Sequence, residues 1–148
     1  MKWILLCAII WLGYMHGYSQ NYSAIASSSA VYNDALNQLF AVISKSNGID
    51  KLYVDATNVQ FRPESFHNPH VAFITREFIL KSKQERGIYV LRPLELEGGK
   101  ICVFLTRYMA SKIGKMASYK KVIDYKFIYK YDCSRNSWVF DEMKEFGF

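Results

Sequence analysis

Two tight-turn signals in the C-terminal half of the sequence constrain its fold most strongly. The Gly98-Gly99 pair lies between two β-rich runs, and such a pair is typical of a two-residue hairpin turn. The segment Ser134–Ser137 separates two further β-rich runs in the same way. We therefore expect four consecutive strands in an antiparallel meander, namely Gly87–Glu97, Lys100–Ala110, Val122–Asp132 and Trp138–Lys144.

One helix is expected before these strands, from Ala30 to Ser46. Its apolar residues recur every three or four positions and would form one broad face. They are Tyr32, Ala35, Leu36, Leu39, Phe40, Val42 and Ile43. The preceding serines can cap the first turn, Asp34 suits the N-terminal end, and Asn47-Gly48 is a fitting stop.

The middle of the chain is less regular. Lys51–Phe61 predicts a strand, whereas the prolines within residues 62–70 predict a loop. Val71–Lys83 begins like a strand but would also suit a short helix after Thr75. The fold class that follows is α+β, with the N-terminal helix packed on a curved antiparallel sheet.

The first expected hairpin is apolar on both faces, so both faces need cover. One face would carry Ile88, Val90, Leu94, Leu96, Ile101, Val103 and Leu105. The helix can cover one face of the sheet. The other could be covered by Val71–Lys83, by a second copy of the chain in a homodimer, or by a partner.

Two cysteines, Cys102 and Cys133, fall on or beside neighbouring expected strands. A register that sets them opposite each other gathers aromatic residues of three strands on one face, which cross-strand packing favours. We therefore expect a Cys102–Cys133 disulfide, and two buried free thiols are the alternative. Most of the aromatic residues are expected in the core. A partly open wall that would suit an apolar or sugar ligand is expected from Tyr108, Tyr129, Tyr131 and Trp138.

The first 19 residues have the organisation of a cleaved export signal. Lys2 precedes an apolar run from Trp3 to Leu12, and small residues at Gly17 and Ser19 suit cleavage before Gln20. The run is too short for a transmembrane anchor. We expect a signal peptide at residues 1–19, a flexible lead-in at 20–29 and a single globular domain at 30–148, in the periplasm or outside the cell.

Basic residues outnumber acidic ones by 19 to 13, and the excess collects towards the C-terminal half. The cluster consists of Arg107, Lys112, Lys115, Lys120, Lys121, Lys126 and Lys130. Such a cluster attracts anionic lipids, acidic glycans or nucleic acid, but it is also typical of a solvated strand face. No nucleic-acid-binding motif accompanies it, so no nucleic-acid partner is expected.

No catalytic motif is recognisable in the sequence. His67 and His70 lie close to Glu64, but their spacing matches no metal-binding signature, so we expect neither a metal nor a cofactor. A small pocket enzyme, of the hydrolase or isomerase type, would need one of these histidines beside a buried aspartate. The candidate aspartates are Asp55, Asp124 and Asp132.

The order of a helix at Ala30–Ser46 and strands over Gly87–Phe148 resembles the cystatin-like and NTF2-like α+β folds. The ending YKFIYKYDCSRNSWVF looks like the C-terminal hairpin of small secreted NTF2-like domains from bacteria. That resemblance implies either a binding module or an enzyme with an Asp/His pocket. No Asp/His pair can be matched here, so we expect an exported, non-enzymatic module that binds a small ligand or a protein. The small pocket enzyme is the alternative.

Overall fold

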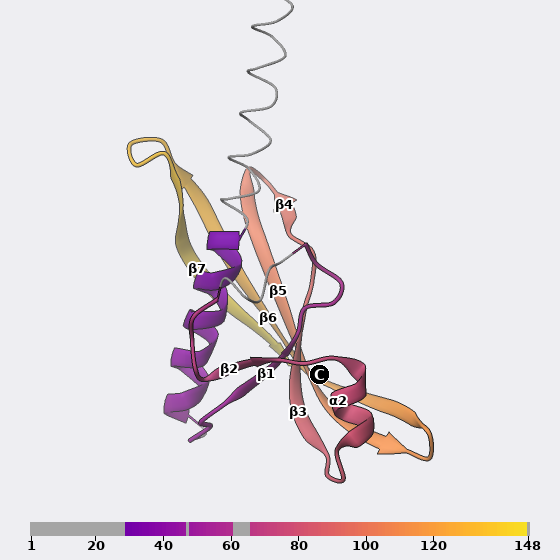
Figure 1. Ribbon diagram of the computed structural model, residues 1–148. Coiled ribbons are helices and arrows are strands. Elements are labelled where there is room, and N and C mark those ends of the chain that lie inside the picture. The colour runs from indigo at the N-terminus through magenta and orange to yellow at the C-terminus, as the bar shows by residue number, and fades with distance from the viewer. Residues whose placement is uncertain (1–28, 47, 61–65, 148) are drawn as a thin grey trace, which may run out of the picture.

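The computed structural model describes residues 29–46, 48–60 and 66–147 (Figure 1). The expected signal peptide at residues 1–19 and residues 20–28 of the expected lead-in lie outside this part of the chain. A long helix covers residues 29–46, as the sequence predicts. The elements that follow are β1 (Leu52–Asp55), β2 (Val71–Phe73), α2 (Arg76–Lys81), β3 (Arg86–Leu91), β4 (Glu95–Glu97), β5 (Lys100–Ile113), β6 (Met116–Asp132) and β7 (Ser137–Gly147).

The strands form one curled sheet in the order β2-β1-β3-β5-β6-β7, and β4 pairs with β5 nearer the Gly98-Gly99 turn (Figure 1). From β3 onward all neighbours are antiparallel, so the expected meander is confirmed. The sheet is nevertheless mixed, because β1 is parallel to both β2 and β3. Parallel neighbours need a crossover connection, and the segment with β2 and α2 provides it between β1 and β3. The α+β class is confirmed.

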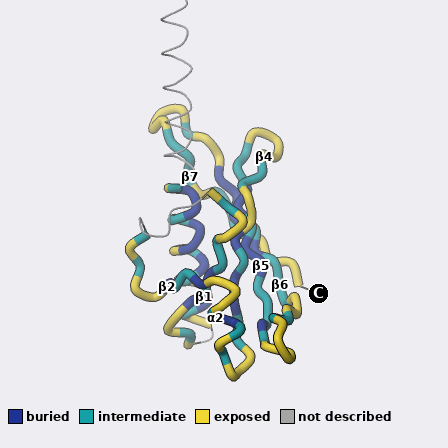
Figure 2. Tube along the Cα trace, turned by 45° about the vertical axis from the view of Figure 1, so that its right-hand side comes forward, coloured by how far each residue is buried: buried dark blue, intermediate teal, exposed yellow. Residues whose placement is uncertain are grey.

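The long helix packs on one face of the sheet and forms the main core with it (Figure 2). Leu36, Leu39 and Ile43 are almost fully buried there, beside Leu105 and Phe127 from the central strands. Burial of a side chain of this size contributes about 1.5–3 kcal/mol. The helical periodicity therefore identified the buried face correctly, except at the exposed Val42.

The irregular middle segment contains both elements that its sequence allowed. Strand β1 is shorter than expected, because Asp55 accepts hydrogen bonds from the backbone and side chain of Thr57 and turns the chain. After β2, the helix α2 begins directly after Thr75 and covers part of the other face of the sheet. There Ile79 packs with Ile88 in a second, smaller core. The chain itself thus supplies cover for this part of the face.

A one-residue offset at Arg92–Leu94 divides the first hairpin into β3 and β4. The register of β4 with β5, continued into β3, would place Leu91 opposite a residue one position further along β5. Leu91 pairs instead with Leu105. Proline cannot donate a ladder hydrogen bond, so the strand is interrupted at the proline within this segment. Because side chains alternate along a strand, the offset moves Ile88 and Val90 to the face under α2. Their expected placement with Leu105 is wrong for this reason.

The register between β5 and β6 also differs from the expected one. Both strands continue to a two-residue turn, Gly114-Lys115, which sets Cys102 opposite Ile128 rather than Cys133. Gly114 has a φ of 62°, which suits the first central position of such a turn. Both cysteines are free, with Cys102 buried and Cys133 exposed. The expected Cys102–Cys133 disulfide is therefore corrected to two separate thiols.

We expect iodoacetamide to label Cys133 in the native protein and Cys102 only after unfolding. Cys102 is 1% exposed, and burial raises the pKa of its thiol, so little reactive thiolate is accessible. Peptide mass spectrometry of protein purified without reductant measures both sites. Cys133→Ser is the control and should remove the native labelling. A peptide pair joined through the two cysteines would contradict the structure.

An extra residue in β7 places Asp141 between two lysines. The β6–β7 register shifts at this point, so Asp141 has no residue opposite it on β6. Its two carboxylate oxygens lie 2.7 Å from Lys100 Nζ and 2.9 Å from Lys130 Nζ. Hydrogen bonds from both lysines lower the pKa of Asp141 to about 2.

We expect Asp141→Asn to reduce the acid sensitivity of the fold. Since the folded state lowers this pKa from 3.8, ionised Asp141 stabilises the fold above about pH 4, and this contribution is lost as the pH falls through 2. The melting temperature of the wild type, followed by circular dichroism, should therefore fall more steeply over this range than that of the variant. Asp50→Asn, in the loop before β1, should follow the wild type. Parallel acid profiles for the wild type and Asp141→Asn would refute the assignment.

Candidate ligand-binding site

A pocket of about 730 Å³ opens between the first turns of the long helix and the β6–β7 hairpin. Figure 1 shows this hairpin extending past the beginning of the helix. The helix contributes Ala30, Val31 and Asp34. The hairpin contributes the rest of the described lining, which is Tyr129, Tyr131, Asn136, Ser137, Trp138, Val139 and Phe140. The pocket thus combines aromatic walls with a carboxylate, an amide and hydroxyl groups.

The aromatic rings reach the pocket because β6 and β7 place them on the face that the helix covers. Tyr131 is opposite Trp138, and Tyr129 is opposite Phe140. The rings of these pairs meet edge to face, with centroids 5.2 and 5.8 Å apart. Tyr129 lies beside the helix and is 1% exposed, whereas Tyr131 lies beyond it and is 44% exposed. The pocket therefore has a buried base and an open mouth.

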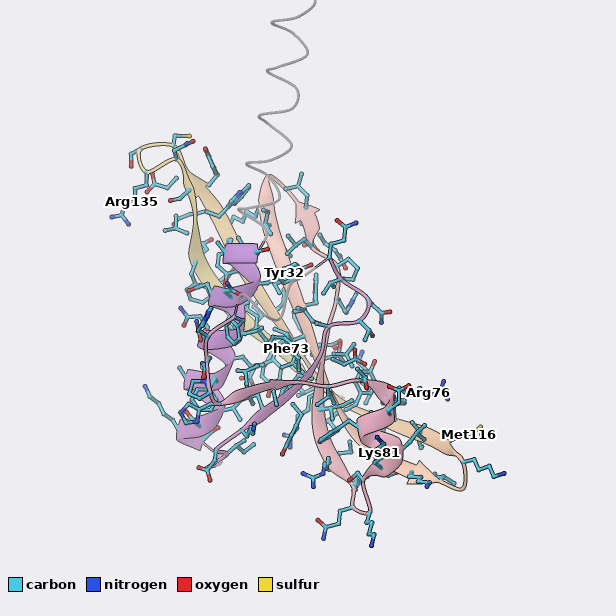
Figure 3. The ribbon with its side chains drawn as sticks, viewed as in Figure 1. Tyr32, Phe73, Arg76, Lys81, Met116 and Arg135 are labelled. Carbon is cyan, nitrogen blue, oxygen red and sulfur yellow. The ribbon has the colours of Figure 1, made fainter. Side chains whose placement is uncertain are left out.

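A four-residue turn closes the hairpin above this pocket. Asp132 Oδ1 accepts backbone hydrogen bonds from Ser134 at 2.9 Å and Arg135 at 3.4 Å, and the last residue pair of the hairpin is Asp132 with Ser137. Arg135 is labelled at this tip in Figure 3. Asn136 has a φ of 49°, which asparagine tolerates, and it accepts a hydrogen bond from the Tyr131 hydroxyl. The turn thereby orients one of the pocket's exposed rings.

One hydrogen bond joins the helix to the base of the pocket. The Tyr129 hydroxyl donates to Asp34 Oδ2 at 2.8 Å. Burial, assisted by this hydrogen bond, raises the pKa of Tyr129 well above its usual value, so the phenol stays a neutral donor. A carboxylate has about four lone-pair sites, so Asp34 keeps acceptor capacity for a ligand.

Three of the four residues expected to bind a ligand lie together in this pocket: Tyr129, Tyr131 and Trp138. Tyr108 does not, because the corrected β5–β6 register places it in the second core with α2. From the sequence, Asp34 is expected only to suit the N-terminal end of the helix. Its position three residues after Val31, at the border of the apolar face, was the signal that could have identified it.

Neither His67 nor His70 lines the aromatic pocket. His70 is exposed, stacks on Phe40 with ring centroids 4.7 Å apart, and has Nδ1 3.0 Å from the Asp50 carbonyl oxygen. The candidate aspartates have local partners: Thr57 for Asp55, Thr106 and Lys121 for Asp124, and Ser134 for Asp132. The histidine beside a buried carboxylate that the enzymatic alternative requires is therefore not supplied at this pocket.

The expected basic cluster is divided among several places. Lys112, Lys115 and Lys120 are exposed around the β5–β6 hairpin, whose tip carries Met116 in Figure 3. Three other members are in ion pairs, namely Lys121 with Asp124, Lys126 with Glu97 and Lys130 with Asp141. Arg107 lies on the face of β5 that also carries Leu105, away from these pairs.

Comparison with protein-family models, curated proteins and solved structures finds no match to this chain. Within the described ranges, no helix is long and apolar enough to cross a membrane. Over the same ranges, no group of three or more histidine, cysteine, aspartate or glutamate residues is placed to hold a metal ion. The interpretation of the pocket therefore depends on its own geometry.

We expect Tyr129→Phe to lower the free energy of unfolding by about 1–3 kcal/mol, because it removes the donor to the part-buried Asp34. Urea denaturation followed by circular dichroism measures the change. Tyr131→Phe is the matched control, since its hydroxyl bonds to Asn136 at an exposed site and its loss should cost less than about 1 kcal/mol. Equal destabilisation by the two variants would contradict the role assigned to the Tyr129–Asp34 bond.

Proposed function

We propose that this protein is an exported, non-enzymatic binding module whose aromatic pocket takes a small sugar or a ligand of similar amphipathic character. The proposal depends on one observation: Tyr131, Trp138 and Asp34 all line one pocket of about 730 Å³. Small-ligand sites typically occupy about 300–1,000 Å³ and combine apolar walls with a few polar groups.

The chemistry of the lining supports a sugar more than a purely apolar ligand. The C–H face of a sugar ring can pack on exposed aromatic rings such as Tyr131, while its hydroxyl groups donate to carboxylate and amide oxygens. Asp34 and Asn136 supply such oxygens on opposite walls, from the helix and from the hairpin turn. Binding needs only these groups, whereas the enzymatic alternative needs His67 or His70, which are elsewhere.

Trp138 is the only tryptophan in residues 20–148, so the fluorescence of the mature chain would report on the pocket directly. We expect titration with a panel of mono- and disaccharides to change this emission saturably for at least one sugar. Asp34→Asn should weaken that binding about tenfold, because hydrogen bonds to a charged acceptor are stronger than those to a neutral one. The amide oxygen of this variant can still accept from Tyr129, so the fold should be retained.

Tyr131→Ala should weaken sugar binding by a similar factor, and Tyr119→Ala is its matched control. The two tyrosines are 44% and 41% exposed, but Tyr119 belongs to the part of β6 near Tyr108 and not to the pocket. Equal loss in both variants, or no saturable signal with any sugar of the panel, would overturn the proposal.

Export and fold relationship are proposed on separate grounds. The charged start, short apolar run and small residues of the first 19 positions support removal of residues 1–19, and an intact mass starting at Gln20 would test it. The long helix on a curled antiparallel meander supports a distant likeness to the NTF2-like or cystatin-like folds. The parallel pairing of β1 departs from the meander on which that likeness rests.

A further inference from the structure

A second, smaller pocket lies at the other end of the long helix from the aromatic pocket. Its volume is about 220 Å³, and Ile49, just after the helix, forms part of its wall. An 18-residue helix is about 27 Å long, so the two pockets are separate sites. Three cations line or border the second pocket: Lys51, Arg86 and Arg107.

The pocket opens where two parallel strands diverge. Strands β1 and β3 pair only through Val54 with Tyr89 and Asp55 with Val90, so the residues before these pairs are not joined. Gly87 lies in this gap, directly beside the Arg107 guanidinium. A Cβ at this position would be 3.5 Å from Arg107 Nε, so a larger side chain would extend across the guanidinium and narrow its access to the pocket.

Two buried donors in this pocket lack a partner among the described residues. They are the Tyr89 hydroxyl and Arg107 Nε. Tyr89 is only 2% exposed, and burial raises its pKa to about 12, so at neutral pH it remains a hydrogen-bond donor. Leaving such groups unsatisfied is costly, so their convergence on one pocket requires an explanation.

Arg86 and Tyr53, which also line this pocket, are held in position. Arg86 Nε donates to Ser82 Oγ at 3.1 Å, and its Nη1 lies 3.4 Å from the Tyr53 hydroxyl. The Arg86 guanidinium also lies over the rings of Tyr53 and Phe78, 5.5 and 5.7 Å from their centroids. None of the three cations forms an ion pair with a carboxylate in the described ranges.

We infer that this pocket binds a small oxyanion, a phosphate or carboxylate group, between Arg107, Arg86 and the Tyr89 hydroxyl. Arginine presents a planar array of donors that matches both groups, and a hydroxyl beside it adds a neutral donor. Lys51 lies at the exposed rim and adds attraction without a fixed geometry. The excess of positive charge in the pocket is what such an anion would neutralise.

Isothermal titration calorimetry at pH 7 and constant ionic strength, with inorganic phosphate in one arm and acetate in the other, tests this site. We expect saturable binding at one site per chain in at least one arm. The phosphate arm responding alone would identify a phosphate ligand, and the acetate arm responding alone would identify a carboxylate ligand. Saturation in neither arm would overturn the inference.

Two variants distinguish anion binding at this site from a general attraction of anions to a basic protein. Arg107→Gln should weaken binding at least about tenfold, whereas Lys112→Gln, the same charge change on the exposed β5–β6 hairpin, should leave it unchanged. Equal weakening of anion binding by both variants would contradict the inferred site. Wild-type anion affinity in Arg107→Gln would contradict it as well.

Tyr89→Phe is the second variant and decides alone if Arg107→Gln fails to fold. It should weaken anion binding severalfold while leaving the melting temperature without added anion unchanged or higher, because the hydroxyl has no partner to lose. A lower melting temperature together with unchanged affinity would show that the hydroxyl serves the fold and not an anion. Saccharide binding at the aromatic pocket should be unaffected, so failure of this inference leaves the proposed function standing.

Discussion

The packing of the rest of the molecule depends on strand β6, whose side chains point alternately to the two faces of the sheet. This strand is 17 residues long, which makes it the longest strand of the described sheet, and it pairs with β5 on one side and with β7 on the other. Its odd-numbered residues from Tyr125 to Tyr131 point to the face under the long helix. Because neighbouring side chains of a strand point to opposite faces, a shift of one residue would send the core rings to the α2 side. The core and the base of the aromatic pocket are consecutive stretches of this one row.

The long helix packs on this row of β6 side chains. The contact between helix and row differs between the middle of the helix and its N-terminal end. In the middle the contact is apolar, between Leu39 and the rings of β6. At the N-terminal end it becomes polar through Asp34 and Tyr129, which are 95 residues apart in the sequence. Past that bond the hairpin extends beyond the described part of the helix, so no described residue of the helix covers this side of its rings. The pocket therefore arises because the hairpin is longer than the helix that covers it.

Much of this architecture could be predicted from local sequence patterns. The long helix, the Gly98-Gly99 hairpin and the strand-then-helix character of Val71–Lys83 all follow from periodicity and turn residues, which act over a few positions. The β5–β6 register could have been predicted as well, because Gly114-Lys115 is a two-residue turn signal; the pairing assumed between Cys102 and Cys133 concealed it. Tyr129, Tyr131 and Trp138 line one pocket, because Tyr131 pairs with Trp138 and Tyr129 lies two residues before Tyr131 on the same face of β6.

The remaining features depend on long-range packing. No local sequence pattern predicts that β1 pairs in parallel with β3. The same is true of the divergence of these two strands beside Gly87, which forms the cationic pocket. The irregularity at Asp141 is likewise fixed by lysines on two other strands. The position of Asp34 at the border of the helix's apolar face marks it as a candidate, but its contact with Tyr129 depends on how far the hairpin extends along the helix. The polar residues of both pockets thus come together where the local pattern ends and tertiary contacts decide their positions.

The irregularity at Asp141 also affects how the molecule meets its neighbours in solution. Strand β7 is the last strand of the described sheet on its side, and an edge of 11 residues is long enough to recruit a foreign strand. The extra residue bends the edge and divides its row of backbone donors and acceptors into two short stretches. A pair of lysines bound to one aspartate at that bend adds charge where an approaching strand would have to align. The same feature that strengthens the hairpin therefore protects the protein against edge-to-edge aggregation.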